Sequence, residues 1–579
     1  MNNPISNLYR PIAPWSGRLI LPQPSQRKPD GGVFIQIQNA PSSHRFLVGK
    51  QAWVKWHSTS HHTLWLSRAT LDLKFDSTTY NSIEKTQAIH PKRLDGWQKV
   101  SPLESLAGAR PDDDVQVELN VISATQEGNS WVLSIGDEPY QIAGVTKGLV
   151  TFVGPAGDRR YRVRHYNPAS KAFNGPEEIV SCPDAGAIRS GQTVEQSSLV
   201  NIEKSPLNAG GWYIYGHSDS QGTFVVAALE PLEAMQLVAT QMTTGRQETQ
   251  DYYVASKWQN LPQRRIEKTL VDNNNKVLAA SERTAALRER RTRELWYLND
   301  IALTIHTFGW RGGPRGNNPP LGLAPGHFSF GFAKVIRDEF TGHLRFDLVH
   351  RQVYAHNKEG IISGAIRWHA YVGSLKRGWM YTVPISEVML RMPEFTVPYK
   401  LGDRTFDPLK TIEQELAFTC ARYRTGPGNG ASVVTPATSC VKDSCQSLFA
   451  AINRLDAEVL NDPAIRRWMQ DNSQSFDAQR FQRLDTLLKD VLDRMLIPLG
   501  YVPKGWRGDR EYLAAHRQGG LLGNTIEALR SWKTMLPRRA EMELAQVMAR
   551  HGATFWDIKG AMLGGEVPGI VPIPPGTLL

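Results

Sequence analysis

The sequence predicts an α+β protein with several domains, in which β-rich barrel or sandwich domains precede a mixed α+β domain and a helical C-terminal region. Residues 46–56 and 63–75 alternate apolar and polar side chains and are rich in β-branched and aromatic residues, as strands are. Residues 476–496 instead repeat apolar side chains at helical spacing. A chain of 579 residues has room for about three or four domains.

We expect five segments along the chain. They are a first β-rich domain at 1–118, a second, barrel-like β-rich domain at 119–269, a charged connecting helix at 270–300, the mixed α+β domain at 301–455 and the helical region at 456–579. Within the second segment, short runs such as residues 148–154 and 211–217 have the composition of strands. Their spacing favours a small barrel or sandwich.

The composition is that of an ordinary soluble globular protein, with 41% hydrophobic and 21% charged residues. No apolar run reaches the ~18 residues of a membrane helix, and the first residues lack the basic and apolar regions of a secretory signal. Four cysteines make no disulfide framework, and no Cys-x-x-Cys pair suggests zinc. We therefore expect no transmembrane segment, no metal and no cofactor, and a location in the cytoplasm or at the membrane periphery.

An excess of basic residues makes an anionic partner conceivable. Lys and Arg number 67 against 56 Asp and Glu, a net charge of +11. Residues 281–295 interleave arginine with glutamate, and residues 309–320 are rich in arginine and glycine. Such segments suit nucleic acid or an anionic membrane surface. A solvated helix face with internal ion pairs is the simpler explanation for the first of them.

A hairpin is predicted to place a histidine beside polar side chains. Residues 328–337 and 344–356 both alternate, and the turn-forming residues 338–343 separate them. Side chains repeat on one face of a strand every second residue. His327, at the start of the first strand, should therefore share a face with Gln352, Tyr354 and His356, any of which could orient its imidazole.

A cysteine is predicted at the start of a helix. The glycine-rich residues 425–430 precede Cys440, and an apolar stripe that includes Cys445 follows at helical spacing. Cys440 falls off that stripe, at the positive end of the helix, where the pKa of a thiol is lowered as a nucleophile requires. The loop glycines would let backbone amides approach an oxyanion. Cys445, on the stripe, belongs to the core.

The order of a histidine strand, polar residues and a cysteine helix resembles the circularly permuted papain-like (NlpC-type) fold of cysteine peptidases, amidases, lipid hydrolases and acyltransferases. The resemblance covers residues 325–452, about a fifth of the chain. It implies Cys440 as the nucleophile, His327 as the base, and Gln352 or His356 as the orienting group. The spacing departs from that pattern, because more than 100 residues separate the histidine from the cysteine.

A second resemblance extends over most of the chain. Residues 7–22, 101–114, 211–224 and 425–440 are similar to a cyanobacterial family named as predicted Abi (CAAX) family proteases. That name implies an intramembrane metalloprotease, which needs several long apolar spans and a paired-glutamate motif within them. The chain has no such span, and its Glu177 and Glu178 lie in a polar segment.

The sequence therefore predicts a thiol hydrolase that cleaves an amide or ester bond of a peptide, amide or lipid-ester substrate with a Cys440 and His327 dyad. The alternative is a non-catalytic binding or scaffold protein for nucleic acid or a protein partner. A CAAX-type protease is the third hypothesis, because the membrane spans are absent from the sequence.

Overall fold

The computed structural model describes most of the chain, and every structural statement below concerns these residues. They are 8–59, 66, 71–72, 97, 99–109, 115–182, 199, 201–253, 257, 266–272, 296–309, 326–353, 356–357, 360–361, 363–376, 385–425, 440–495 and 536–560.

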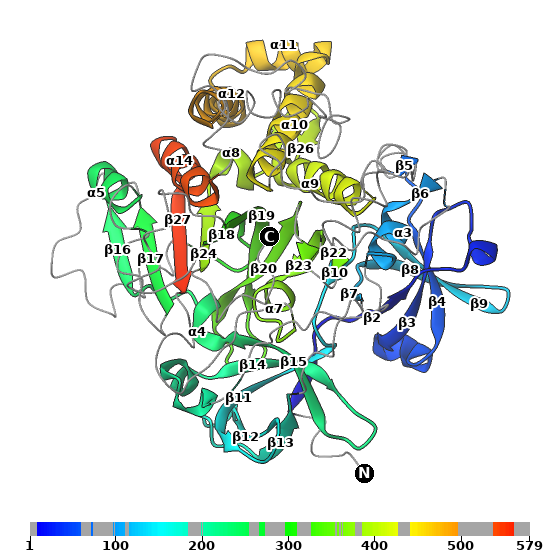
Figure 1. Cartoon of the computed structure of the whole chain (residues 1–579). Helices are drawn as coiled ribbons and strands as arrows, with labels where there is room; N and C mark the ends of the chain where they lie inside the picture. The colour runs from blue at the N-terminus through cyan, green and yellow to red at the C-terminus, as the bar shows by residue number, and fades with distance from the viewer. Residues whose placement is uncertain are drawn as a thin grey trace, which may run out of the picture.

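Fifteen strands form one mixed sheet that extends through most of the molecule (Figure 1). Their order across the sheet is β16 (Gln241–Thr244), β17 (Ile266–Asp272), β27 (Thr554–Gly560), β24 (Ile385–Arg391), β18 (Ile301–Gly309), β19 (Gly326–Arg337), β20 (Leu344–Gln352), β23 (Gly364–Arg367), β10 (Tyr140–Gln141), β7 (Gln116–Glu118), β2 (Ser16–Ile20), β3 (Val33–Asn39), β4 (Gln51–Trp56), β9 (Ser130–Ile135) and β8 (Val121–Glu127).

The predicted hairpin is present at the centre of this sheet. β19 and β20 pair antiparallel, from Arg337 opposite Leu344 to Phe330 opposite Arg351. Asp338 stabilises the turn, because its Oδ1 accepts hydrogen bonds from the backbone amides two and three residues later, at 3.1 and 2.7 Å. Such an aspartate turn sets the register of a hairpin.

Five strands close on themselves into a small barrel on one side of the sheet (Figure 1). Around the barrel they are β11 (Thr146–Pro155), β12 (Arg160–His165), β13 (Glu177–Ser181), β15 (Phe224–Pro231) and β14 (Trp212–Ser218), and β14 returns to pair with β11. The short β1 (Tyr9–Pro11) adds to β11. β12 alternates exposed and buried residues along its whole length, as a barrel wall requires. The barrel begins later than the predicted bound at residue 119, because β8, β9 and β10 join the large sheet.

Helices cover the face of the sheet that points away from the barrel (Figure 1). The longer ones are α9 (Pro408–Thr425), α10 (Cys440–Leu460), α11 (Pro463–Asp471), α12 (Phe476–Met495) and α14 (Pro537–Arg550). Of the shorter helices, α5 (Arg246–Asp251) and α8 (Pro393–Thr396) lie beside the longer ones. α4 (Leu232–Met235) and α7 (Trp368–Tyr371) pack into the core shared with the barrel, and α3 (Pro102–Ala107) packs into the core of the N-terminal strands. Three small strand pairs complete the structure: β5 (Leu71–Asp72) with β6 (Lys99–Val100), β21 (His356–Asn357) with β22 (Gly360–Ile361), and β25 (Tyr399–Leu401) with β26 (Arg404–Phe406).

The central strands therefore have two different faces, which we call the helix-side and the barrel-side face. Phe328 and Phe330 of β19 pack into the core beneath α9, α10 and α14, on the helix-side face. Phe308 of β18 and Ile385 of β24 pack into the core shared with the barrel and α7, on the barrel-side face. Because neighbouring residues of a strand point to opposite faces, β17, β27, β24, β18 and β19 each contribute to both cores.

Two parts of the sequence form strands where we expected helix. Residues 270–272, the start of the predicted connecting helix, end β17, and residues 273–295 lie outside the described residues. β27 lies in the predicted helical region but inserts between β17 and β24. Its Phe555 is buried on the helix-side face and its Trp556 on the barrel-side face. Apolar residues on both sides are typical of a central strand.

α12 covers the residues whose spacing predicted a helix, and α14 also lies within the predicted helical region. The mixed α and β character of the protein is thus confirmed. None of the described helices has the length and apolarity needed to cross a membrane.

Candidate metal centre

Four ionisable side chains gather on the barrel-side face of the central sheet. They are His306 of β18, His327 of β19, His350 of β20 and Glu387 of β24. His306 and His350 are 0% exposed and Glu387 is 1% exposed, so water does not solvate this cluster. The burial of charged or polar groups is costly unless they are paired.

Glu387 is the centre of the cluster. Its Oε1 lies 2.7 Å from His306 Nδ1 and 3.0 Å from His350 Nε2, and it accepts a third hydrogen bond from Trp368 Nε1 at 3.0 Å. Burial by itself would raise the pKa of Glu387, but the two histidines lower it to about 2. The carboxylate is therefore charged at neutral pH, and both histidines point a ring nitrogen at it.

Two imidazole nitrogens of the cluster have no partner. His306 Nε2 and His350 Nδ1 are buried, and neither has a hydrogen-bond partner among the described residues. Burial lowers the pKa of His306, so its neutral form is favoured and one ring nitrogen keeps a free lone pair. Most buried polar atoms in proteins are hydrogen-bonded, so two such nitrogens in one cluster call for an explanation.

The side chains meet across four neighbouring strands because β19 carries small residues opposite the two histidines of the flanking strands. In β19, Ser329 lies opposite His306, and Gly331 lies opposite His350. The two imidazole rings meet above these small residues, with centroids 4.3 Å apart. A side chain at Gly331 would not fit, since its Cβ would lie 2.4 Å from the carbonyl oxygen of Val349.

Two histidines and one glutamate are a common ligand set for a divalent transition metal. One ligand atom from each of the three residues lies within 4.8 Å of the others. In a tetrahedral site with bonds of ~2.0–2.1 Å, ligand atoms are about 3.3 Å apart. The observed separations of 2.7 and 3.0 Å from Glu387 Oε1 are about 0.6 and about 0.3 Å shorter than this. A small outward shift of the rings would therefore admit an ion.

His327, the predicted base, belongs to this cluster rather than to a cysteine site. Its Nε2 is hydrogen-bonded to Gln352 Oε1, so the predicted orienting residue is in place. Gln352 in turn donates from Nε2 to Ser329 Oγ at 3.2 Å. The ring of Tyr371 covers His327 at 6.1 Å between centroids. Burial lowers the pKa of His327 to about 3, so the imidazole stays neutral.

Cys440, the predicted nucleophile, is the first residue of α10 as expected, but it faces the other core. Its thiol is within hydrogen-bond reach of the backbone of Phe328, on the helix-side face, whereas the ring of His327 lies beside Phe308, on the barrel-side face. Cys440 is 6% exposed, and burial raises the pKa of its thiol to about 12. The expected lowering by the helix end is therefore wrong, because loss of hydration outweighs it. Cys440 and His327 thus face the two different cores of the sheet.

The other predicted site features are only partly described. His356 is in β21, paired with Ile361, but its side chain lies outside the described part of the chain. Tyr354 and the glycine-rich residues 426–430 also lie outside it. Cys445 is buried in the core as predicted.

Cys440 should react slowly with iodoacetamide at neutral pH. A pKa of about 12, against an ordinary value of 9.0, lowers the thiolate fraction about a thousandfold. The labelling rate should rise about tenfold per pH unit, since only the thiolate reacts. Mass spectrometry of the peptide that contains Cys440 measures this rate, and the same chain in urea is the control that labels quickly. Rapid labelling of the folded protein near pH 7 would restore the thiol hydrolase hypothesis.

His306, His350 and Glu387 were not among the site residues predicted from the sequence. A usable signal was present, because each is an ionisable residue inside a run of strand-forming apolar residues, at 301–309, 344–352 and 385–391. Comparisons with protein-family models, with curated proteins and with solved structures found no significant match, so the geometry of the site is the basis for its interpretation.

Proposed function

We propose that this protein binds one divalent transition-metal ion through His306, His350 and Glu387. The observation that supports the proposal best is the buried carboxylate whose Oε1 lies 2.7 and 3.0 Å from one ring nitrogen of each of two buried histidines. Imidazole and carboxylate ligands together suit Zn²⁺ or Fe²⁺ and are a poor match for Mg²⁺ or Ca²⁺. An ion would offset the buried negative charge and join β18, β20 and β24.

The burial of the ligands favours a structural role for the ion. Catalytic metal sites keep a position open to substrate, whereas all three ligand side chains here are 2% exposed or less. Trp368 would act behind the ligands, because its indole donates to Glu387 and fixes the orientation of the carboxylate. The thiol hydrolase and scaffold functions stay predictions from the sequence, and the alkylation experiment tests the first.

Metal analysis tests the proposal directly. The purified protein is incubated with Zn²⁺ or Fe²⁺ and then desalted. It should retain about one ion per chain, as measured by inductively coupled plasma mass spectrometry. The variants His306→Gln and Glu387→Gln should lose most of the bound metal, since each removes one of the three protein ligands. His165→Gln is the matched control, because His165 is a buried histidine bonded to Glu178 at 2.8 Å in the barrel, away from the cluster.

Two outcomes would count against a metal. One is a folded wild-type protein that retains less than about a tenth of an equivalent of either ion. The other is equal retention by the wild type and both ligand variants. A second measurement guards against variants that fail to fold: added metal should raise the melting temperature of the wild type and of His165→Gln, because an ion that binds the native state stabilises it.

A further inference from the structure

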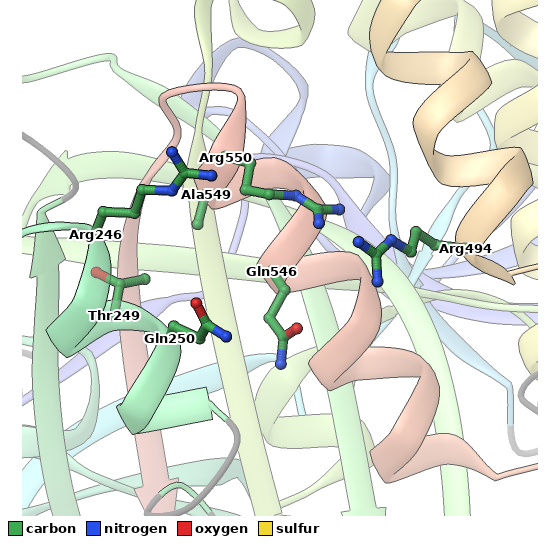
Figure 2. A pocket seen from close by; sticks show the side chains of 7 residues that line it. All are labelled: Arg246, Thr249, Gln250, Arg494, Gln546, Ala549 and Arg550. Carbon is green, nitrogen blue, oxygen red and sulfur yellow. The ribbon is translucent and has the colours of Figure 1, made fainter.

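Three arginines from α5, α12 and α14 line one pocket, and no residue of the metal centre lines it (Figure 2). They are Arg246 of α5, Arg494 near the end of α12 and Arg550 at the end of α14. The amide side chains of Gln250 and Gln546 complete the polar lining. In Figure 2 the guanidinium groups of Arg494 and Arg550 point toward one another, with Arg246 facing them from α5. Three helices that are distant in the sequence thus each contribute an arginine to the same pocket.

Acids close to this pocket share their hydrogen bonds with groups outside its lining. Asp490 contacts Arg550 Nη2 at 3.3 Å, longer than the ~2.7–2.9 Å of a strong charge-assisted hydrogen bond, and it is shared with His551. On α5, Asp251 accepts a hydrogen bond from Gln247, and Glu248 turns back toward the start of its own helix at Gly245. None of these acids lines the pocket.

Arg246 in particular has no ion pair or hydrogen bond to any described residue, although it lines the pocket. Arginine presents a planar fork of N–H donors that matches the oxygens of phosphate. Glutamine amides add neutral donors that do not repel an anion. The lining therefore consists of donors and positive charge, which is the chemistry of a site for an oxyanion.

We propose that this pocket binds the phosphate group of a small ligand, through Arg246, Arg494 and Arg550. Its volume is about 170 Å³, smaller than the ~300–1,000 Å³ of sites for drug-sized molecules. A single phosphate group with a small substituent suits this space. The pocket is also a local cluster of side chains, unlike the extended basic groove that follows a nucleic-acid backbone. The phosphate comes from free inorganic phosphate or from a phosphorylated small molecule.

Titration calorimetry with inorganic phosphate and with glycerol phosphate tests the proposal on the full chain. The wild type should bind at least one of them, and Arg246→Gln and Arg550→Gln should each weaken binding at least about tenfold, equivalent to ~1.4 kcal/mol. Arg466→Gln is the matched control, because Arg466 is an exposed arginine on α11 outside the pocket. Its affinity should equal that of the wild type. Circular dichroism spectra confirm that each variant is folded.

The outcomes distinguish free phosphate from a phosphorylated small molecule, and they test the phosphate site independently of the metal site. Tighter binding of glycerol phosphate than of inorganic phosphate identifies a phosphorylated small molecule, and equal or weaker binding identifies free phosphate. Absence of binding of both probes at millimolar concentration, or equal affinity in the wild type and both pocket variants, overturns the proposal. The metal analysis is unaffected by either result, because no residue of the metal centre lines this pocket.

Discussion

Replacement of Lys257 by methionine should lower the free energy of unfolding by about 3–5 kcal/mol, because it leaves two buried carboxylates without their cation. The Lys257 ammonium contacts Glu541 of α14 and Asp557 of β27, the latter at 3.1 Å, and all three side chains are 0% exposed. Ser386 donates to Glu541 at 2.8 Å, and Tyr252 donates to Asp557 at 2.6 Å. These neutral donors cannot offset the charge that the substitution leaves behind.

The loss of unfolding free energy in Lys257→Met should increase with pH. Burial already raises the pKa of Glu541, and removal of Lys257 should raise it further. A carboxyl group whose folded pKa exceeds its unfolded pKa destabilises the fold as pH rises above the unfolded value, near 4.3. The difference between Lys257→Met and the wild type should therefore be smaller at pH 5 than at pH 8. Urea unfolding followed by circular dichroism measures both values.

Matched variants show whether the burial of the charged groups causes the loss of stability in Lys257→Met. Lys489 pairs with Asp485 on α12, and their side chains are 66% and 42% exposed. Lys489→Met should cost no more than about 0.5 kcal/mol, since exposed helical pairs contribute little. Adding Glu541→Gln to Lys257→Met should recover part of the loss, because one uncompensated charge disappears. If Lys257→Met cost no more than Lys489→Met, the buried network would not hold α14 to the sheet.

Replacement of Arg424 by methionine should lower the free energy of unfolding by about 3 kcal/mol, the low end for a broken buried pair, because Glu138 keeps Arg351 at 3.3 Å. Arg424 is 0% exposed at the end of α9, and its guanidinium donates to Glu138 Oε1 at 2.6 Å and to the Ser363 carbonyl at 3.2 Å. It also donates to Ser105 Oγ and to the Pro102 carbonyl of α3, at 3.1 and 3.3 Å. The same residue thus ties α9 to α3 and to Glu138.

Hydrogen exchange distinguishes this linkage from a general loss of stability. From the wild type to Arg424→Met, the exchange rates of the amides of residues 104–108 should increase more than those of β19. The reason is that α3 loses its hydrogen bonds to Arg424 of α9, while the central hairpin keeps its own hydrogen bonds. Arg404→Met is the control, since Arg404 is 59% exposed and pairs with Asp462 at the surface. A uniform increase in exchange across both segments would contradict the proposed role of Arg424.

Local features of the fold could be predicted from the sequence. The β19 and β20 hairpin, the start of α10 at Cys440, and α12 and α14 follow from alternation, helical spacing and turn residues. The contact between His327 and Gln352 could also be predicted, since the two strands are close in sequence and their register depends on one short turn.

Only the tertiary structure decided which face of the sheet each side chain meets. Cys440 and His327 were predicted to form a dyad, but the sheet lies between their cores, and whether α10 packs on one face or the other is not a local property of the chain. Burial then reversed the expected pKa of the thiol, because desolvation depends on the neighbours that packing supplies.

The metal centre was decided in the same way. His306, His350 and Glu387 come from separate strands, and only the pairing of β24, β18, β19 and β20 places them together. Of the three strands, the sequence by itself predicted the one that carries His350, at residues 344–356. The order of the strands, and therefore the cluster, depends on long-range pairings whose free energy is shared over the whole sheet, which short-range patterns do not encode.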